Sequence, residues 1–280
     1  STLVSYSQDA RVAAHASASC VLWLLGHPKQ AMERGQYALN LAKELSHPFS
    51  QAYALNFLGT LSQLCGDHAL TSQYADAQIA LSETYGFSFW AATGGMLKAL
   101  AESPKQPPEV TCQNFQDEMT DYENSGNRLA LPYFQAILIG LLQNAGQIKR
   151  AQQIVESSLL EASSTGEEFF TAELLRLKGE LILSQNPENF SAAETLFIQA
   201  YEYASQQKSN ALALRVITSL TRMLSNKITT DDSPHHFQTS LHDAKNQLET
   251  LTKQFANGKR TEDTLIAEQL LSSIAAHSPA

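Results

Sequence analysis

The feature that most constrains this chain is a set of turn residues at a fixed spacing. Gly26, Gly66 and Gly146 lie 40 or 80 residues apart, and Asn186 and Asn226 occupy the same phase. Glycine and asparagine tolerate the left-handed backbone conformation in which many helices end. The spacing therefore predicts a unit of about 40 residues, with a helix on each side of its turn, that repeats along the chain.

The helix before each turn carries side chains that repeat with the same period. Seven residues before the turn stand Ser19, Gly59, Ala99, Ile139, Gly179 and Ser219, and small side chains allow two helices to cross closely. Three further columns are mostly apolar, and their spacing places them on one helical face. They are Ala14, Ala54, Gly94, Phe134, Leu174, Leu214; Ser17, Phe57, Leu97, Ile137, Leu177, Ile217; and Val21, Leu61, Ala101, Leu141, Leu181, Thr221. A second apolar stripe follows each turn, so each unit is expected to be a helical hairpin.

We therefore expect an all-α fold in one domain over residues 1–280. Its predicted form is a right-handed superhelix, an α-solenoid, of about six antiparallel helix pairs closed by a C-terminal capping helix. The expected pairs cover residues 10–44, 49–84, 88–125, 129–164, 168–206 and 210–257, and the cap covers 262–276. Pro104, Pro107 and Pro108 replace the turn of the third pair, which predicts a longer loop from about 102 to 109.

Several residues resemble the tetratricopeptide repeat. Leu58-Gly59 followed by Gly66-Asp67 matches its Leu-Gly pair and Gly-Asp turn, and two second helices match its Ala, Phe and Ala positions. The matching second-helix residues are Ala31 and Ala38, and Ala193, Phe197 and Ala200. The period is about 40 residues instead of 34, so each helix is longer by about a turn. Such longer repeats resemble those of the maltose-regulator-like ATPases.

The resemblance extends to one group within these proteins. Its landmarks are residues 8–12 (Gln-Asp-Ala-Arg-Val), 22–28 (Leu-Trp-Leu-Leu-Gly-His-Pro), 46–50 (Ser-His-Pro-Phe-Ser) and 173–181. They are similar to the C-terminal repeat region of large bacterial proteins that combine a class III adenylate or guanylate cyclase-like domain with a predicted AAA-type ATPase. The resemblance implies a regulatory module that controls nucleotide-dependent domains upstream. The start without Met fits a fragment or a processed chain.

Charge and composition narrow the expected partners. The formal net charge of −9 argues against nucleic acid and anionic membranes, which attract clustered Lys and Arg. No apolar run approaches the roughly 18 residues that span a bilayer, and three cysteines without a C-x-x-C spacing favour free thiols in a reducing compartment. We expect a cytoplasmic protein.

No motif for catalysis or cofactor binding is found. The chain lacks a P-loop, a G-x-G-x-x-G run and a G-x-S-x-G elbow, so neither nucleotide binding nor a serine nucleophile is predicted. His235 and His236, with His242 and Asp243 nearby, form the densest histidine cluster but lack a diagnostic metal-ligand spacing. We predict no catalytic residue, no cofactor and no metal site in this chain.

The tetratricopeptide resemblance implies where a partner would bind. In such arrays the first helix of each pair lines the concave side and contacts the ligand. The groove register falls on Tyr53, Asn56, Thr60, Gln63, Tyr133, Gln143, Glu173, Arg176 and Glu180. These side chains fit a recognition surface, and they fit a solvated groove almost as well.

The sequence therefore favours a binding or regulatory module of a larger signalling protein over an enzyme. Its partner is expected to be a protein or peptide, or the upstream domains of the same polypeptide. The alternative is a ligand- or peptide-sensing superhelix that changes curvature on binding. A homodimer through the third pair or the final helix stays open.

Overall fold

The fold is all-α, as predicted. The computed structural model describes residues 7–228, 235–255 and 260–277, and over these residues it contains thirteen α-helices, one short 3₁₀ helix and no strand. The chain forms two compact units. Unit 1 consists of Ser1–Trp23 and His27–Leu129. Unit 2 consists of Leu24–Gly26 and Ala130–Ala280. None of the described helices is both long and apolar enough to cross a membrane.

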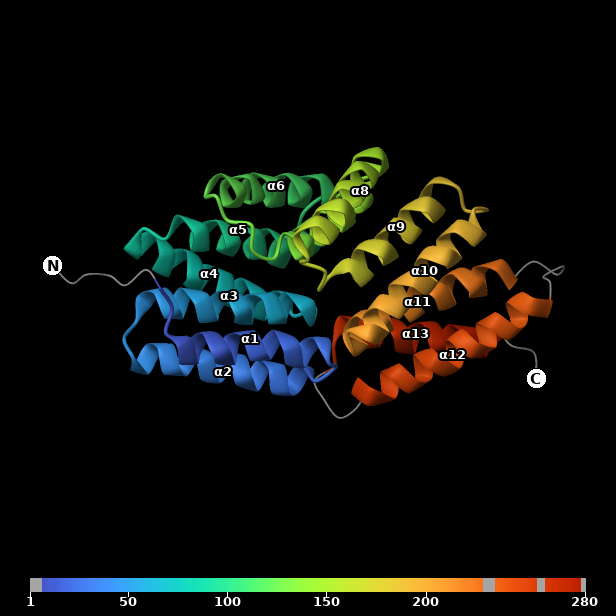
Figure 1. Cartoon of the computed structure of the whole chain (residues 1–280), viewed down its shortest axis with the longest axis horizontal. Helices are drawn as coiled ribbons and strands as arrows, with labels where there is room; N and C mark the ends of the chain where they lie inside the picture. Colours follow the sequence, from blue (N-terminus) through green and yellow to red (C-terminus); the bar gives the residue numbers. More distant parts are fainter. Residues whose placement is uncertain (1–6, 229–234, 256–259, 278–280) are drawn as a thin grey trace. The chain divides into compact units, whose positions relative to one another are not determined.

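Unit 1 is a row of helices in which each packs on the next (Figure 1). The helices are α1 (Ala10–Leu24), α2 (Pro28–Glu44), α3 (Pro48–Leu64), α4 (His68–Tyr85), α5 (Ser88–Glu102), the 3₁₀ helix η1 (Ser103–Lys105) and α6 (Pro108–Asn124). The odd-numbered helices α3 and α5 also contact each other directly. This arrangement is that of stacked helical hairpins.

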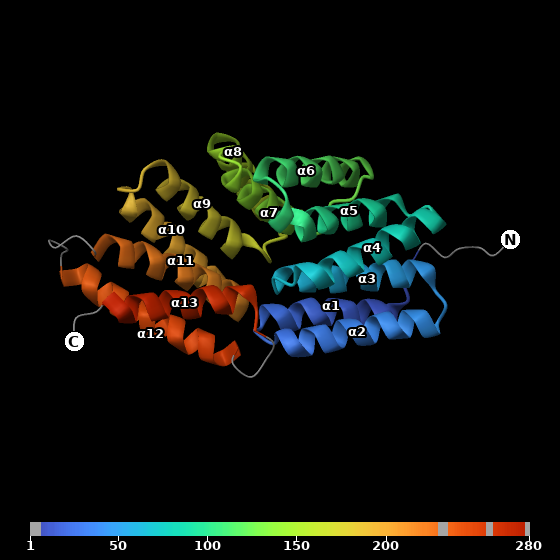
Figure 2. The ribbon, with the colours of Figure 1, turned by 180° about the vertical axis from the view of Figure 1, so that it is seen from behind.

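Unit 2 repeats the same packing. Its helices are α7 (Leu131–Asn144), α8 (Ile148–Thr165), α9 (Thr171–Gln185), α10 (Phe190–Gln206), α11 (Asn210–Ile228), α12 (His235–Phe255) and α13 (Glu262–His277). Consecutive helices pack together, and the odd-numbered helices α7, α9, α11 and α13 contact one another in that order. Figure 2 shows α13 beside α11 and α12. The helix α13 therefore takes the place that the first helix of another pair would have.

Left-handed residues mark the helix ends about every 20 positions. Positive φ angles occur at Gly26, Ser46, Gly66, Gly86, Gly126, Gly146 and Gly166, which confirms the role predicted for the glycines. The series is interrupted at Gln106 and Asn186, whose φ angles are −125° and −140°. Each of these residues precedes a proline, which forces the residue before it into extended backbone.

Two sequence-based predictions about helix ends were wrong. Asn186 is extended because Pro187 follows it. Asn226 lies inside α11, since no glycine or proline stops that helix before Ile228. The longer connection predicted near 102–109 is present as residues 103–107, where η1 continues from α5 and Pro108 opens α6, because a proline in the first turn is well tolerated.

The apolar columns are mostly buried in the later odd-numbered helices but not in α1. Ala54, Leu174 and Leu214 are fully buried, whereas Ala14, Ser17 and Val21 are exposed, Val21 by 53%. In α5 the equivalent face points at the preceding helix, since a Cβ on Gly94 would lie 2.8 Å from Ile79 of α4. No described helix precedes α1, so its face stays open to solvent.

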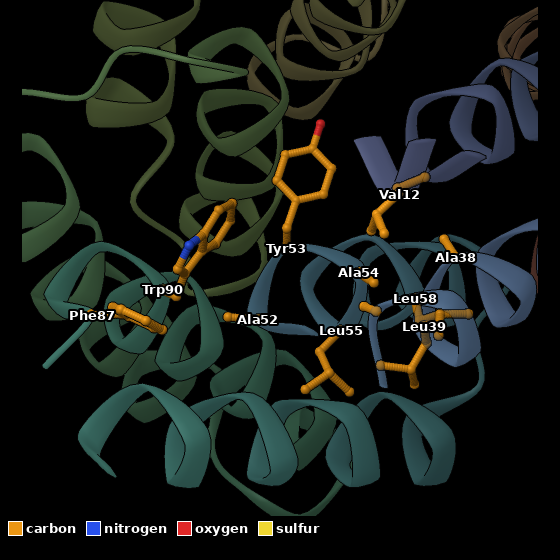
Figure 3. Close-up of a cluster of buried hydrophobic side chains, with 12 residues drawn as sticks. Val12, Ala38, Leu39, Ala52, Tyr53, Ala54, Leu55, Leu58, Phe87 and Trp90 are labelled. Atoms are coloured by element: carbon orange, nitrogen blue, oxygen red, sulfur yellow. The ribbon is translucent and has the colours of Figure 1, made fainter. Parts of the chain in front are cut away.

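Close helix crossings depend on the small-residue column. A Cβ at Gly59 would lie 2.7 Å from the side chain of Leu97, and one at Gly179 would lie 2.7 Å from Phe197. Figure 3 shows part of the core that these crossings create in unit 1, where Tyr53 and Leu55 leave α3 in opposite directions. Leu55 joins the aliphatic core, and Tyr53 lies beside Trp90.

Candidate functional site

The predicted groove residues of unit 1 all lie on α3, and one of them is part of the core. Tyr53 is only 8% exposed. Its ring stacks on Phe57 with centroids 4.7 Å apart and meets Trp90 edge-on at 5.6 Å (Figure 3). Its hydroxyl lies 3.4 Å from the Ser17 hydroxyl of α1. Tyr53 therefore joins α3 to α5, and it offers little surface to a partner.

Asn56, Thr60 and Gln63 follow Tyr53 along α3 and are half-buried. Asn56 accepts a 3.4 Å hydrogen bond from Gln78, a fully buried residue of α4. The Gln78 amide also donates to the Trp90 carbonyl at 2.7 Å and to the Thr93 hydroxyl at 2.8 Å. The amide thus ties α4 to α3 and α5, and neutral polar groups line this side of unit 1.

The predicted residues at the start of unit 2 connect α7 to α9. Tyr133 is 5% exposed, and its ring meets Phe170 edge-on at 5.5 Å. Gln143 donates a 2.9 Å hydrogen bond to the Ser184 hydroxyl of α9. Both contacts join successive odd-numbered helices, as Tyr53 and Trp90 do in unit 1.

The remaining predicted residues belong to a chain of ion pairs that we call the ion ladder. It consists of Glu173, Arg176, Glu180, Arg215, Arg222 and Asp263. Arg176 donates two hydrogen bonds to Glu173, at 2.8 and 2.9 Å. Such a two-pronged geometry is the strongest that an arginine and a carboxylate form.

The ion ladder runs across three odd-numbered helices. Glu173 on α9 lies 3.5 Å from Arg215 on α11, and Arg215 donates at 2.9 Å to Asp263 on α13. A second path links α9 to α11 through Ser219, which accepts from Arg176 at 3.1 Å and donates to Glu180 at 2.6 Å. Three guanidinium groups thus face three carboxylates, and the charges balance.

The electrostatics keep every described ladder group with a shifted pKa in its charged state. Burial opposes ionisation of Glu173, but Arg176 and Arg215 outweigh it and lower its pKa from 4.5 to about 2. Burial likewise disfavours the charge on Arg215, but Asp263 and Glu173 raise its pKa. Groups held this firmly in one state do not exchange protons near neutral pH.

Two hollows open beside the ion ladder. One has a volume of about 190 Å³ and lies between α9, α11 and α13, where Arg176, Arg215, Thr218 and Ile266 contribute to its wall. The other has a volume of about 430 Å³ and extends from Ser219 and Arg222 toward the start of α10. Arg222 lines both hollows, is 45% exposed at its side chain and approaches Glu180 only to 3.8 Å.

No protein-family model and no curated protein sequence matches this chain. Within the described ranges, no group of three or more His, Cys, Asp and Glu side chains is arranged to hold a metal ion. The side chains of His235 and His236 lie outside the described residues, so the expectation that this histidine cluster holds no metal stays a prediction.

Sequence reasoning missed four residues of this site: Arg215, Ser219, Arg222 and Asp263. The signal for Arg215 was present, because it is a single charge inside the apolar run from Ala211 to Ile217. Asp263 resembled an ordinary acidic residue in the first turn of a helix. The predicted residues Glu173, Arg176 and Glu180 bond to these side chains, so their part in partner binding stays a prediction.

Proposed function

We propose that this chain is an interaction module of a larger bacterial signalling protein, an ATPase or nucleotide cyclase. In this proposal the two units are parts of a right-handed superhelix of about six tetratricopeptide-like pairs with α13 as its cap. The module is cytoplasmic and binds a partner protein or the upstream domains of its own polypeptide. It has no catalytic activity of its own.

The observation that carries the proposal is the charge state of the ion ladder. General acid and base catalysis needs a group whose pKa lies near the working pH. The pKa of Glu173 is about 2 instead, and the arginines beside it are stabilised as cations. Fixed charges beside two hollows suit the binding and orientation of a ligand, and they do not suit proton transfer.

The exposed part of α3 supplies a second argument. Asn56, Thr60 and Gln63 are half-buried, uncharged and spaced three to four residues apart, so they form one polar stripe along the helix. Side chains of this kind can hydrogen-bond a partner without the cost of desolvating a charge. We assign them to the partner-contacting surface of unit 1.

The test is affinity capture with the full chain as bait and cross-linking mass spectrometry as the readout. One variant combines Asn56→Ala, Thr60→Ala and Gln63→Ala on α3. The matched control combines Glu33→Ala, Gln73→Ala and Glu83→Ala, which are exposed polar positions on α2 and α4. The proposal requires a partner that binds the wild type and the control and is lost from the α3 variant. A partner lost only from the control would place recognition on the even-numbered helices and contradict it.

The hollow of about 430 Å³ favours a second function, that of a ligand sensor. Its volume is within the range typical of small-molecule sites, and its wall combines Arg222 and Glu188 with Phe190, Leu183 and Met223. A sensor would gain thermal stability with its ligand. Screening metabolites by thermal shift, with Arg222→Gln as the comparison, separates the two functions, because only a sensor shows a shift that the substitution removes.

A further inference from the structure

The helix α13 holds its position with few contacts. Among the side chains described in α13, only Thr264 and Ala267 are buried, and Leu265 is 41% exposed. Ile266, Leu270, Leu271 and Ile274 remain half-exposed. Its strongest polar contact with α11 is the 2.9 Å ion pair of Asp263 with Arg215. Elements with so little buried apolar surface open more readily than the core.

The surface beneath α13 is incompletely filled. The hollow of about 190 Å³ is bounded by Asp263 and Ile266 of α13 on one side and by Arg215, Thr218 and Arg222 of α11 on the other. Between α9 and α10, by contrast, Phe197 closes directly over Gly179. The surface under α13 can therefore accept a larger side chain at the position of Ile266 than α13 provides.

Arg215 is positioned whether or not α13 is present. Its guanidinium also lies 3.5 Å from Glu173, and Glu173 is fixed in turn by Arg176. Removal of Asp263 thus leaves Arg215 with a carboxylate partner on α9. The α11 surface is preorganised for a carboxylate, and preorganisation reduces the entropic cost of binding.

We propose that this surface of α11 docks a helix from a partner protein and that α13 is its exchangeable internal occupant. The partner helix carries a carboxylate in its first turn and small side chains one and four residues later, as α13 does with Asp263, Thr264 and Ala267. The inference rests on the proposed function as an interaction module. It adds the location of a second docking surface, the chemistry of its ligand and a competitor within the chain.

The test uses a fluorescein-labelled peptide with the sequence of residues 260–277, titrated into the full chain and followed by fluorescence anisotropy. Asp263→Asn weakens only the internal helix, so the open surface becomes more populated and the apparent affinity for the peptide rises by about fivefold or more. Arg215→Gln removes the group that both helices need, so the internal helix and the peptide are weakened together and the affinity does not rise. The two substitutions break the same ion pair, yet only Asp263→Asn raises the affinity.

Matched controls are Asp76→Asn and Arg11→Gln, which alter exposed ion pairs on other helices and should leave the peptide affinity unchanged. Arg215→Lys retains a cation for both helices and should also show no rise in affinity, and circular dichroism verifies that each variant is folded. No peptide binding, or an equal rise for Asp263→Asn and Arg215→Gln, would mean that α13 is only a structural cap. The capture experiment on α3 does not involve this surface, so the proposed function can survive such a result.

Discussion

Units 1 and 2 join their odd-numbered helices with different chemistry. Between α3 and α5 of unit 1 the contacts are aromatic and amide groups, as in the 5.6 Å approach of Tyr53 to Trp90 and the hydrogen bonds from Gln78. Between α9, α11 and α13 of unit 2 they are ion pairs, centred on Arg215 between Glu173 and Asp263. The backbone arrangement is alike, and the side chains that secure it are not.

The two units nevertheless share one aromatic contact. Tyr53 meets Trp90 and Tyr133 meets Phe170, in both cases 37 residues further along the chain and edge-on at 5.5 to 5.6 Å. In unit 2 this aromatic contact joins α7 to the start of α9, and the ion ladder begins on α9. The repeat thus fixes where helices meet, whereas the sequence of each pair determines whether the contact responds to pH and salt.

The largest effect is expected where unit 1 depends on a single large side chain. Trp90→Ala removes a ring that is 4% exposed and contacts Phe49, Tyr53 and Phe89. The free energy of unfolding should fall by about 3–5 kcal/mol, as for other large buried aromatic residues. Urea unfolding measures the change. Leu129→Ala, at a side chain that is 63% exposed, should cost less than about 0.5 kcal/mol, and similar losses for both variants would contradict the described core.

The second effect is the contribution of the Glu173 carboxylate to the stability of unit 2. Because the pKa of Glu173 is depressed from 4.5 to about 2, its charge stabilises the folded chain above about pH 4.5. That contribution, roughly 3 kcal/mol, is lost as the pH falls toward 2. Glu173→Gln should therefore destabilise the chain at pH 7, and the difference from wild type should shrink at pH 2.5 in urea unfolding curves. A difference independent of pH would show that the carboxylate acts by packing alone.

The amide network of unit 1 should respond differently. Gln78→Met keeps the volume of the buried side chain but removes its hydrogen bonds to Trp90 and Thr93. We expect a loss of about 1–2 kcal/mol, because an acceptor oxygen of Gln78 that has no partner is removed as well. The loss should be equal at pH 7 and pH 2.5, measured by thermal unfolding. A marked dependence on pH would contradict the distinction between neutral contacts in unit 1 and ion pairs in unit 2.

The smallest effect belongs to an ion pair on the surface of unit 1. Lys98 lies 2.9 Å from Asp76 and 3.4 Å from Glu102, and both carboxylates are solvent-accessible. Solvent and salt screen such pairs, so Lys98→Ala should cost less than about 1 kcal/mol. Raising the salt concentration should remove the difference from wild type. A loss of stability as large as that of Glu173→Gln would show that solvent exposure does not distinguish the Lys98 ion pairs from the ion ladder.

The helical fold was predictable because glycines at a fixed spacing define the helix ends and apolar columns define the faces between them. Prediction failed where the local surroundings of a residue differed from those of the equivalent positions in the other repeats. Asn186 has the right phase but precedes Pro187, and Ala14, Ser17 and Val21 have the right spacing, but no helix in the described part of the chain covers them. Such failures depend on the next residue or the next helix, which a column of equivalent positions does not show.

The candidate site was predictable only in part. Glu173, Arg176 and Glu180 could be found from the groove register because they repeat with the helix pairs. Arg215 stood out only as a single charge in an apolar run, and its pairing with Asp263 could not be found, since the two lie 48 residues apart and fall outside the 40-residue period. Their contact depends on where α13 packs against α11, a matter of tertiary structure.

The most direct test of the difference between the units is hydrogen exchange of the full chain at pH 7 and pH 2.5, corrected for the intrinsic exchange rates and resolved by peptide. The ion ladder predicts that α9, α11 and α13 lose protection at pH 2.5, whereas α3 and α5, joined by neutral groups, retain theirs. Equal loss in both units, or earlier loss in α3 and α5, would contradict the assignment of ionic and neutral contacts on which the account depends.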